Sequence, residues 1–397
     1  MHACLPILVS ALALQGTPTL ELVESVPIET SLGASDLRDA HTVWVEAIDA
    51  ADTSIELAHF YASEAPSDGD APRRSRLTPV VEALERAADR GVGVRFLLSE
   101  NFRETYPDTA ARLGGRDGIE VRWFDLESTT GGVLHAKTMV LDATSVFVGS
   151  QNFDWRALEH IQELGALVTH PKVAAQFLRV FEQDWATAGS DPFPRRQTEP
   201  EDPSVEIDGA TVTPVFSPAG AIPIGLEWDL PHLLGLIDGA DDSVWVQLLS
   251  YSPTDRDGGW FGELDTALRR AAARGVDVRL TVADWGKRRG RVEWLQSLAP
   301  VPNLEVRMVT IPPAAEGHVP FARCVHAKYM VVDGRAAWLG TSNWSESYFY
   351  ASRNAGLVIE GGPAPARLSR FHLDTWNSPY AYPIDPGATY EAPRIGD

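Results

Sequence analysis

The stretch that decides the fold is Gly132-Val133-Leu134-His135-Ala136-Lys137, which is followed by Asp142 and then by Gly149-Ser150-Gln151-Asn152. The same order of residues returns later as His326-Ala327-Lys328, Asp333 and Gly340-Thr341-Ser342-Asn343. Each matched position is displaced by 191 residues. The equal displacement indicates an internal duplication, and we expect one active site that is supplied in two halves.

In both copies the His and the Lys stand two residues apart within an apolar run. Because side chains alternate between the two faces of a β-strand, both polar groups are expected to project from one face. A second short apolar run, Val146-Phe147-Val148 or Ala336-Ala337-Trp338-Leu339, precedes each Asn. It predicts a neighbouring strand whose end returns the amide of Asn152 or Asn343 toward the histidine.

Two such halves facing each other supply two imidazoles, two ammonium groups and two amides, without thiolates or clustered carboxylates for a metal. We therefore expect no metal and no cofactor. The set suits displacement at a phosphodiester, because lysines and amides can hold the non-bridging oxygens where negative charge grows. One histidine can attack phosphorus and form a phosphohistidine, while the other protonates the departing oxygen and then activates water. The expected catalytic residues are His135, Lys137, Asn152, His326, Lys328 and Asn343.

The duplicated pattern, His-x-Lys followed by Asp and then by Gly-Ser/Thr-x-Asn, resembles the phospholipase D superfamily. Further stretches are similar to the branch of that superfamily that contains the lysosomal 5′-exonucleases, phospholipase D family members three and four. These stretches are Leu20 to Ser25, Gly149 to Leu158, Glu163-Leu164-Gly165, Gly340 to Ser345, Tyr348-Phe349 and Trp376 to Tyr380. The resemblance covers nearly the whole chain. It implies a metal-independent phosphodiesterase that trims single-stranded DNA or RNA from the 5′ end.

Two positions near the motifs are expected to support them. Asp142 and Asp333 lie an odd number of residues from their lysines, so a continuing strand turns them away from the His–Lys face. We expect them to fix the local turn, although the family pattern includes them. Glu163 follows Asn152 by eleven residues, where the second copy has Asn354.

The resemblance implies that an acidic residue at the position of Glu163 accepts a hydrogen bond from Nδ1 of the other half's histidine. Such a bond fixes the tautomer and raises the basicity of Nε2. On this basis His326 is expected to be the nucleophile and His135 the general acid and base. The alternative is that Glu163 forms a surface salt bridge.

Aromatic residues follow both asparagines and the opening strand of each repeat, where stacking on a terminal base would be tolerant of sequence. Core packing is the alternative for every one of these rings. The candidates for substrate contact are Trp155, Tyr348, Trp344, Tyr251 and Phe60. Two basic runs, Arg73 to Arg76 and Lys287 to Arg291, either approach the substrate or lie in solvated loops.

The chain has 397 residues, enough for two domains with full cores, and its 44% hydrophobic and 22% charged residues are typical of a globular protein. A net charge of −21 opposes a wide basic face that would grip duplex nucleic acid. A pocket for one strand end or one lipid head group needs only local positive charge. Cys4 and Cys324 are the only cysteines, which excludes a disulfide framework.

Residues 1–16 begin with an apolar run that predicts a short secretory leader, and hence a secreted or periplasmic protein. A disordered start of a cytoplasmic protein is the alternative. The run is too short to cross a bilayer, and no other segment is apolar enough, so no transmembrane segment is expected. Because both halves lie in one chain, a monomer suffices.

The repeat extends upstream of the motifs. Ala83 to Ala88 followed by Arg90-Gly91-Val92 corresponds to Ala267 to Ala273 followed by Arg274-Gly275-Val276, and each predicts a helix that ends at Gly and enters a strand. The alternation of helices and strands predicts an α/β protein of two pseudo-twofold-related α/β/α halves with mixed sheets and the active site at their seam. The proline-rich residues 190–203 predict a boundary near residue 200, which gives halves of 17–200 and 201–397.

Three functions follow from these observations. The lead is a phosphodiesterase that removes nucleotides from the 5′ end of single-stranded DNA or RNA. The alternative is phospholipase D or transphosphatidylase action on glycerophospholipids, which fits an acidic secreted protein but lacks an obvious apolar docking segment. A non-enzymatic binding protein that kept the fold is disfavoured, because it would have little reason to retain both His–Lys–Asn sets.

Overall fold

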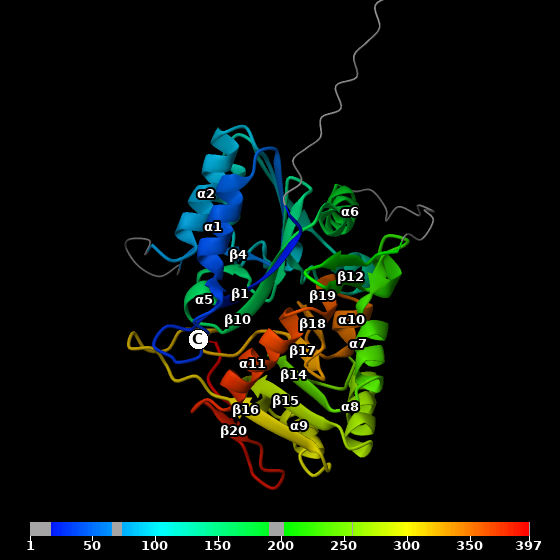
Figure 1. The fold of residues 1–397 in the computed structure, drawn as a ribbon. Coiled ribbons are helices and arrows are strands. Elements are labelled where there is room, and N and C mark those ends of the chain that lie inside the picture. Colours follow the sequence, from blue (N-terminus) through cyan, green and yellow to red (C-terminus); the bar gives the residue numbers. More distant parts are fainter. Residues whose placement is uncertain (1–16, 66–73, 190–201, 256, 397) are drawn as a thin grey trace, which may run out of the picture.

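The computed structural model describes residues 17–65, 74–189, 202–255 and 257–396. The expected leader and the predicted boundary near residue 200 lie outside the described residues. The chain forms two halves stacked on one another, drawn in blue to teal and in green to red in Figure 1. Each half is built around one mixed β-sheet.

The sheet of the first half has eight strands. Their order is β2 (Arg38–Asp39), β1 (Thr19–Ser25), β10 (Glu163–Thr169), β8 (Ser145–Gly149), β7 (Lys137–Leu141), β3 (Ser54–His59), β5 (Gly93–Ser99) and β6 (Ile119–Phe124). The strands β3, β5 and β6 are parallel, while β1, β10, β8, β7 and β3 pair antiparallel. The mixed sheet predicted from the sequence is confirmed.

The sheet of the second half repeats this order and extends it. It runs β11 (Val205–Ile207), β12 (Ala210–Ser217), β19 (Asn354–Gly361), β18 (Ala336–Gly340), β17 (Tyr329–Val332), β14 (Ser243–Leu248), β15 (Asp277–Ala283), β16 (Leu304–Val309) and β20 (Ala381–Pro383), and β13 (Glu227–Trp228) pairs with β12. From β1 to β6 and from β12 to β16, each strand of one half therefore has a counterpart in the same place of the other. A small separate pair joins β4 (Ala62–Ser63) to β9 (Phe153–Asp154).

Helices cover both faces of each sheet. The outer face of the first sheet packs on α1 (Ala40–Ala50) and α2 (Thr78–Asp89), and that of the second on α7 (Asp229–Asp238) and α8 (Glu263–Ala273). The inner faces pack on α6 (Pro171–Ala188) and α11 (Ala364–Trp376), whose apolar side chains share one cluster with strands of both sheets. The remaining short helices are α3 (Asp108–Gly114), α4 (Glu127–Thr130), α5 (Trp155–Glu159), α9 (Val292–Leu298) and α10 (Glu346–Tyr350).

One hydrophobic cluster joins the two halves. It contains Val148 of β8, Phe177 of α6, Leu357 of β19 and Phe371 of α11, all buried. Because apolar surface from both sheets is removed from water in this one cluster, separating the halves would expose it. The seam between the halves is therefore a packed core, which holds the residues at its edge in fixed positions.

The predicted helix ends are confirmed. The helix α2 ends before Gly91, which has φ of +92°, and α8 ends before Gly275, with φ of +98°. Only glycine adopts this left-handed conformation without a steric cost from Cβ, so each glycine ends its helix and turns the chain into the next strand. Among the helices of the described residues, none combines the length and the apolar character that a membrane crossing requires.

Candidate active site

The two motifs lie where the halves meet. Lys137 is the first residue of β7, and Lys328 immediately precedes β17. Each histidine stands two residues before its lysine, so both histidines lie just before a strand. The sequence predicts them within the strand. The prediction was wrong on this point because the residues before each strand pair with the opposite half, which sequence patterns do not reveal.

This cross-pairing is symmetric. Leu134 forms a parallel bridge with Arg353, and the backbone N–H of His135 donates to the carbonyl of Arg353 at 2.9 Å. In the matching place Val325 forms a parallel bridge with Gln162, and the N–H of His326 donates to the carbonyl of Gln162 at 2.8 Å. Each histidine is thus positioned by the half to which it does not belong.

The side chains of the histidines repeat the crossing, but with different partners. His326 Nδ1 lies 2.8 Å from both carboxylate oxygens of Glu163 in the first half. His135 Nδ1 lies 3.0 Å from Oδ1 of Asn354 in the second half. The Glu163 contact implied by the family resemblance is therefore present, and the alternative of a surface salt bridge is wrong, because Glu163 is fully buried. In both pairs the contact with the opposite half is made by Nδ1.

The lysines are held by their own motifs. Lys137 Nζ donates to the carbonyl of His135 at 2.6 Å, and Lys328 Nζ donates to the carbonyl of His326 at 2.5 Å. Both ammonium groups are buried, and all six residues of the two His–Lys–Asn sets are at most 8% exposed. Each ammonium group keeps donor capacity for a ligand, because it carries three N–H groups.

Electrostatics place the two sets within reach of each other. Burial lowers the pKa of His135, and the charges of Lys137 and of Lys328 from the other half lower it further. Burial likewise lowers the pKa of His326, followed by the charges of Lys328 and Lys137. Each lysine thus acts on the histidine of the other half as well as on its own, as expected for four groups buried at one seam.

This centre carries more positive charge than its surroundings balance. Burial lowers the pKa of Lys328 to about 7, although the nearby carboxylate of Glu163 opposes the shift. Burial also lowers the pKa of Lys137 well below its usual value, and Lys328 adds to this effect. An anion at the centre would reverse both shifts, since it stabilises the ammonium forms. The site is therefore suited to a bound phosphodiester anion.

The asparagines differ in how they are fixed. Asn343 accepts a hydrogen bond from the backbone N–H of Ser250 at 3.2 Å and donates to the hydroxyl of Tyr348 at 3.1 Å. Asn152 donates to the hydroxyl of Tyr61 at 3.5 Å, and its buried Oδ1 has no hydrogen-bond partner among the described residues. Tyr61 directly follows the candidate Phe60, and the sequence places both after the opening strand, at the same end of the sheet.

The two motif aspartates act at a distance from the histidines. Asp142 accepts hydrogen bonds from the backbone N–H groups of Asp52, Thr53 and Ser54 at 2.7 to 3.0 Å. Asp333 accepts from Asp241, Asp242 and Ser243 in the same way. Each carboxylate therefore ties the turn after its motif strand to the start of the neighbouring strand. The local role predicted for both is confirmed.

The aromatic candidates divide into two groups. Phe60 and Tyr348 lie on either side of His135, with ring centroids 4.9 and 5.0 Å from the imidazole, and both are half-buried. Trp155, Trp344 and Tyr251 are 7%, 1% and 2% exposed and belong to the hydrophobic core, which favours core packing for these three rings. Tyr251 donates its hydroxyl proton to Asp265 instead.

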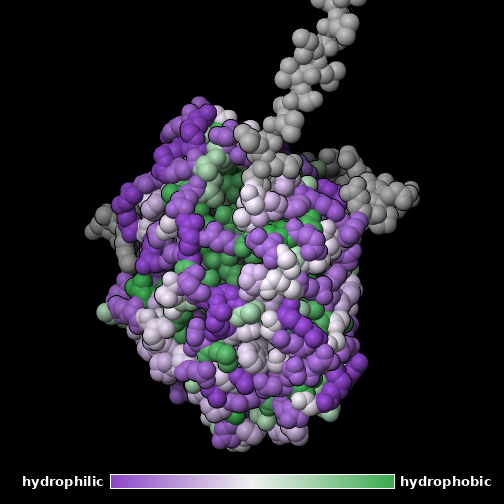
Figure 2. Space-filling view, in the orientation of Figure 1, coloured by the Kyte–Doolittle hydropathy of each residue, from purple (hydrophilic) through white to green (hydrophobic). Residues whose placement is uncertain are grey.

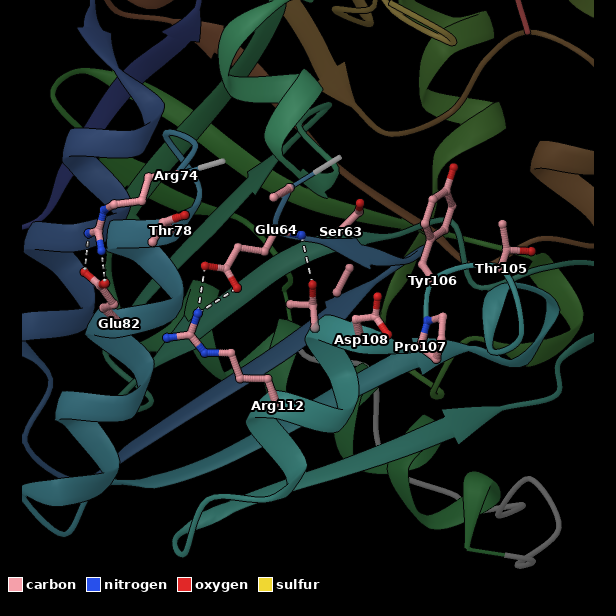
Figure 3. Close-up of a pocket in the computed structure, with 13 residues that line it drawn as sticks. Ser63, Glu64, Arg74, Thr78, Glu82, Thr105, Tyr106, Pro107, Asp108 and Arg112 are labelled. Carbon is pink, nitrogen blue, oxygen red and sulfur yellow. Dashed lines mark hydrogen bonds and ion pairs between the residues drawn. The ribbon is translucent and has the colours of Figure 1, made fainter. Parts of the chain in front are cut away.

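A cavity of about 590 Å³ lies in the first half, next to Tyr106. Figure 3 shows the ion pairs Glu64–Arg112 and Arg74–Glu82 in its wall and Tyr106 at the opposite end. Tyr106 stacks on Tyr61 with ring centroids 4.7 Å apart. Tyr61 in turn contacts Asn152, so two stacked rings lie between the cavity and this asparagine.

The basic runs contribute little free charge where they are described. Arg74 pairs with Glu82, and Arg76 pairs with Asp39, while Arg73 lies outside the described residues. Arg291 differs, because its charge acts on the hydroxyl of Tyr348 and lowers a pKa that burial raises. One end of the second run therefore approaches the site. In the described part of the chain, no group of three His, Cys, Asp or Glu is arranged to hold a metal ion.

Comparisons with known proteins agree with this geometry. A family model described as "Cardiolipin synthase, PLD-like domain" matches residues 44–185 and 233–373, once in each half. The 5'-3' exonuclease PLD3 of Pongo abelii is 31% identical over 404 residues, which cover 92% of this chain and 81% of that protein. Phospholipase D Z of Dictyostelium discoideum is 30% identical over 394 residues, which cover 92% of this chain and 91% of that protein.

The fold is also shared with a solved structure. Phosphatidylserine synthase of Haemophilus influenzae Rd KW20 aligns with a TM-score of 0.56 at 13% identity, over 87% of this chain and 85% of that chain. The family match in both halves confirms the resemblance inferred from the duplicated motif. The chain belongs to the phospholipase D superfamily and is a phosphodiester hydrolase of that superfamily.

Proposed function

We propose that this chain hydrolyses phosphodiesters without a metal ion, through a phosphohistidine intermediate, and that its substrates are the 5′ ends of single-stranded DNA or RNA. The observation that carries the mechanism is the crossed pairing of each histidine with the opposite half, with a carboxylate behind only one of them. That asymmetry assigns different tasks to the two imidazoles.

His326 is the nucleophile in this proposal. Glu163 accepts a hydrogen bond from Nδ1–H of His326, so the lone pair of this ring is on Nε2 and can attack phosphorus. The carboxylate also stabilises the positive charge that develops on the ring. The bound phosphodiester anion stabilises the protonated form of His135, against the effects of burial and the lysines on its pKa. As the P–N bond forms, the P–O bond to the leaving group breaks, and the Nε2 proton of His135 moves to the departing oxygen.

The second step reverses the proton movement. His135 takes a proton from water, the water oxygen bonds to phosphorus, and the P–N bond breaks with its electron pair returning to His326. Lys137, Lys328 and the two asparagine amides hold the non-bridging oxygens in both steps. Because these donors are buried and fixed before substrate arrives, they stabilise the charge of the transition state without reorganisation.

The aromatic rings beside His135 support a nucleic-acid substrate. Phe60 and Tyr348 flank the imidazole, and Arg291 brings positive charge close to Tyr348. Bases stack on such rings whatever their sequence, and arginine adds attraction for the backbone. Figure 2 shows a face dominated by hydrophilic residues, and the net charge of −21 leaves positive charge only locally. One strand end fits this distribution better than a duplex.

The cavity of Figure 3 supplies room for the part of the substrate beyond the scissile phosphate. It opens beyond Tyr106, whose ring continues the stack that Tyr61 begins at Asn152. Its arginines are already paired with glutamates, so it would favour a neutral base and sugar over another phosphate.

A lipid substrate is the second candidate, and one observation favours it. Trp260 is 58% exposed and packs on Trp294 with ring centroids 5.4 Å apart. Tyr350, on the same helix as Tyr348, is 42% exposed. Exposed tryptophan and tyrosine rings favour the interface between a membrane and water. The relatives include both an exonuclease and a phospholipase D by name, so identity of about 30% does not choose between them.

The two substrates are separated by direct assay. The purified chain is incubated with 5′-labelled single strands and, in parallel, with phosphatidylcholine vesicles. We expect release of mononucleotides from the strands and no choline from the vesicles. Choline without nucleotides would overturn the order of the two candidates. If the wild type does release choline, Trp260→Ala serves as the matched variant, because loss of the exposed ring should then lower activity on vesicles and leave activity on strands unchanged. Halves of 17–200 and 201–397, a cleaved leader with a secreted or periplasmic location, and a monomeric state stay predictions.

A further inference from the structure

A buried ion pair that the mechanism does not use lies behind His135. Arg353 is 1% exposed, and its Nε and Nη2 donate to the carboxylate of Asp184 on α6 at 2.7 and 2.8 Å. Two further N–H groups donate to the carbonyls of Ser217 and Ala221 at 2.8 and 2.7 Å. Four of the five N–H groups are therefore engaged, and the ion pair ties the second half to the closing helix of the first.

The backbone of Arg353 holds the histidine. His135 donates its N–H to the carbonyl of Arg353 at 2.9 Å, and Arg353 donates its N–H to the carbonyl of Val133 at 3.0 Å. The next residue, Asn354, contacts His135 Nδ1. One short segment thus sets both the backbone position and the ring orientation of His135, and the ion pair fixes that segment.

The repeat supplies an internal comparison. A displacement of 191 residues carries Gln162 to Arg353 and Asp184 to Thr375. Gln162 Nε2 donates to Thr375 Oγ1 at 2.8 Å, and the carbonyl of Gln162 accepts from His326 N–H at 2.8 Å. The same device therefore stands behind both histidines. On the side of His326, whose ring has a carboxylate partner, the contact joins two neutral side chains. On the side of His135, whose ring has only an amide partner, it is an ion pair.

We propose that the Asp184–Arg353 pair is a positioning pair for His135, which compensates for the weaker hold of Asn354 on the ring. A hydrogen bond to a neutral amide is weaker than one to a carboxylate, so the orientation of His135 depends more on its backbone. A small displacement of a catalytic group is costly for the rate without changing substrate binding. This inference rests on the proposed function only where it concerns turnover.

Two variants remove the pair in different ways. Asp184→Asn keeps the shape but leaves a guanidinium that cannot lose its proton. Arg353→Met leaves Asp184, whose pKa is already raised by burial, so the remaining carboxyl can become neutral. The second variant therefore avoids an unpaired buried charge. Thr375→Val is the matched control, because it breaks the equivalent contact behind His326.

The test combines a magnetic resonance readout with kinetics on bis(p-nitrophenyl) phosphate and on a diester with a poor leaving group. In protein with ¹⁵N-labelled histidine, the signal of His135 is assigned among the ten histidines by its loss in His135→Gln. We expect Asp184→Asn and Arg353→Met to shift the His135 signal only, and Thr375→Val to shift the His326 signal only. On the poor leaving group, kcat should fall about 10- to 100-fold with KM unchanged.

Specific results would overturn the proposal. A folded variant with an unchanged His135 signal and wild-type kcat would do so, and so would loss of the folded state in both variants, since the pair would then serve the fold. If the wild type cleaves no diester while the His135 signal shifts as expected, the proposed function fails and the positioning pair stands.

Discussion

Glu163 of the first half and His326 of the second are joined by contacts of 2.8 Å between each carboxylate oxygen and Nδ1. The equivalent contact in the other direction joins His135 to the amide of Asn354 at 3.0 Å. The two motifs are nearly identical in sequence, yet the Nδ1 atoms of their histidines have different partners, a carboxylate for His326 and an amide for His135. In the proposed mechanism, the difference between nucleophile and acid follows from this one substitution within the repeat.

Glu163→Gln should lower kcat about 10- to 100-fold, because an amide does not hold the same tautomer or stabilise the charged ring. Steady-state kinetics on bis(p-nitrophenyl) phosphate measures the effect. Asn354→Gln, which lengthens the partner of His135, is the control for disturbance of the seam. A Glu163→Gln variant with unchanged kcat would remove the ground for choosing His326 as the nucleophile.

The same variant should change the pH dependence of kcat/KM. Lys328 must be charged, so activity is lost as the pH rises through its pKa, which burial lowers to about 7 against the opposing charge of Glu163. Without that charge the pKa falls further, and the alkaline limb should move to lower pH. A limb that stays in place or moves to higher pH would contradict the shared centre.

Lys137→Met and Lys328→Met should each lower kcat about 100- to 1000-fold, the loss seen when one donor to a developing charge is removed. The melting temperature should not fall, because each ammonium group is buried with a pKa lowered by that burial. Thermal unfolding followed by circular dichroism provides the comparison. A large loss of stability with little loss of turnover would make these lysines structural.

Chelation should leave the rate unchanged, since lysine and asparagine donors supply the charge stabilisation that metal ions give in other enzymes. Turnover is measured before and after dialysis against EDTA, with a metal-dependent nuclease as the positive control for chelation. Activity that disappears with EDTA and returns with a divalent cation would contradict the proposed mechanism.

The turn after the first motif strand offers a prediction on stability. Ala143 has φ of +52°, whereas the second copy has Gly334 at the same place with φ of +63°. A side chain at positive φ is strained by its Cβ, so Ala143→Gly should stabilise the protein by about 0.5 to 1 kcal/mol. Denaturant unfolding tests this, and Gly334→Ala should act in the opposite direction. A destabilised Ala143→Gly variant would be inconsistent with strain at this turn.

The sequence predicts the features that depend on its internal repeat, but it does not predict which aromatic side chains are buried. The displacement of 191 residues identified both His–Lys–Asn sets, and the periodicity of the flanking segments predicted the mixed sheets. Trp344 and Tyr251 looked like substrate rings because they follow strand ends, yet each packs in the core. Position along a strand indicates the edge at which a ring lies, but not whether another element covers it.

The contacts between the halves could not be predicted from the sequence either. The bridges of Leu134 to Arg353 and of Val325 to Gln162 join residues far apart in the chain. No local pattern specifies them, since they depend on how two finished sheets pack. Gln162 and Arg353 occupy matched positions of the repeat, but an amide and a guanidinium do not indicate from the sequence that the two residues play the same part.

The most direct test of the central claim traps the intermediate. His135→Ala is mixed with bis(p-nitrophenyl) phosphate, whose nitrophenolate leaves without a proton, and the quenched protein is digested and mapped by mass spectrometry. We predict a nitrophenyl phosphate group on His326 that accumulates, because His135 is needed to activate water for the second step. Absence of any adduct, or an adduct on a residue other than His326, would contradict the account.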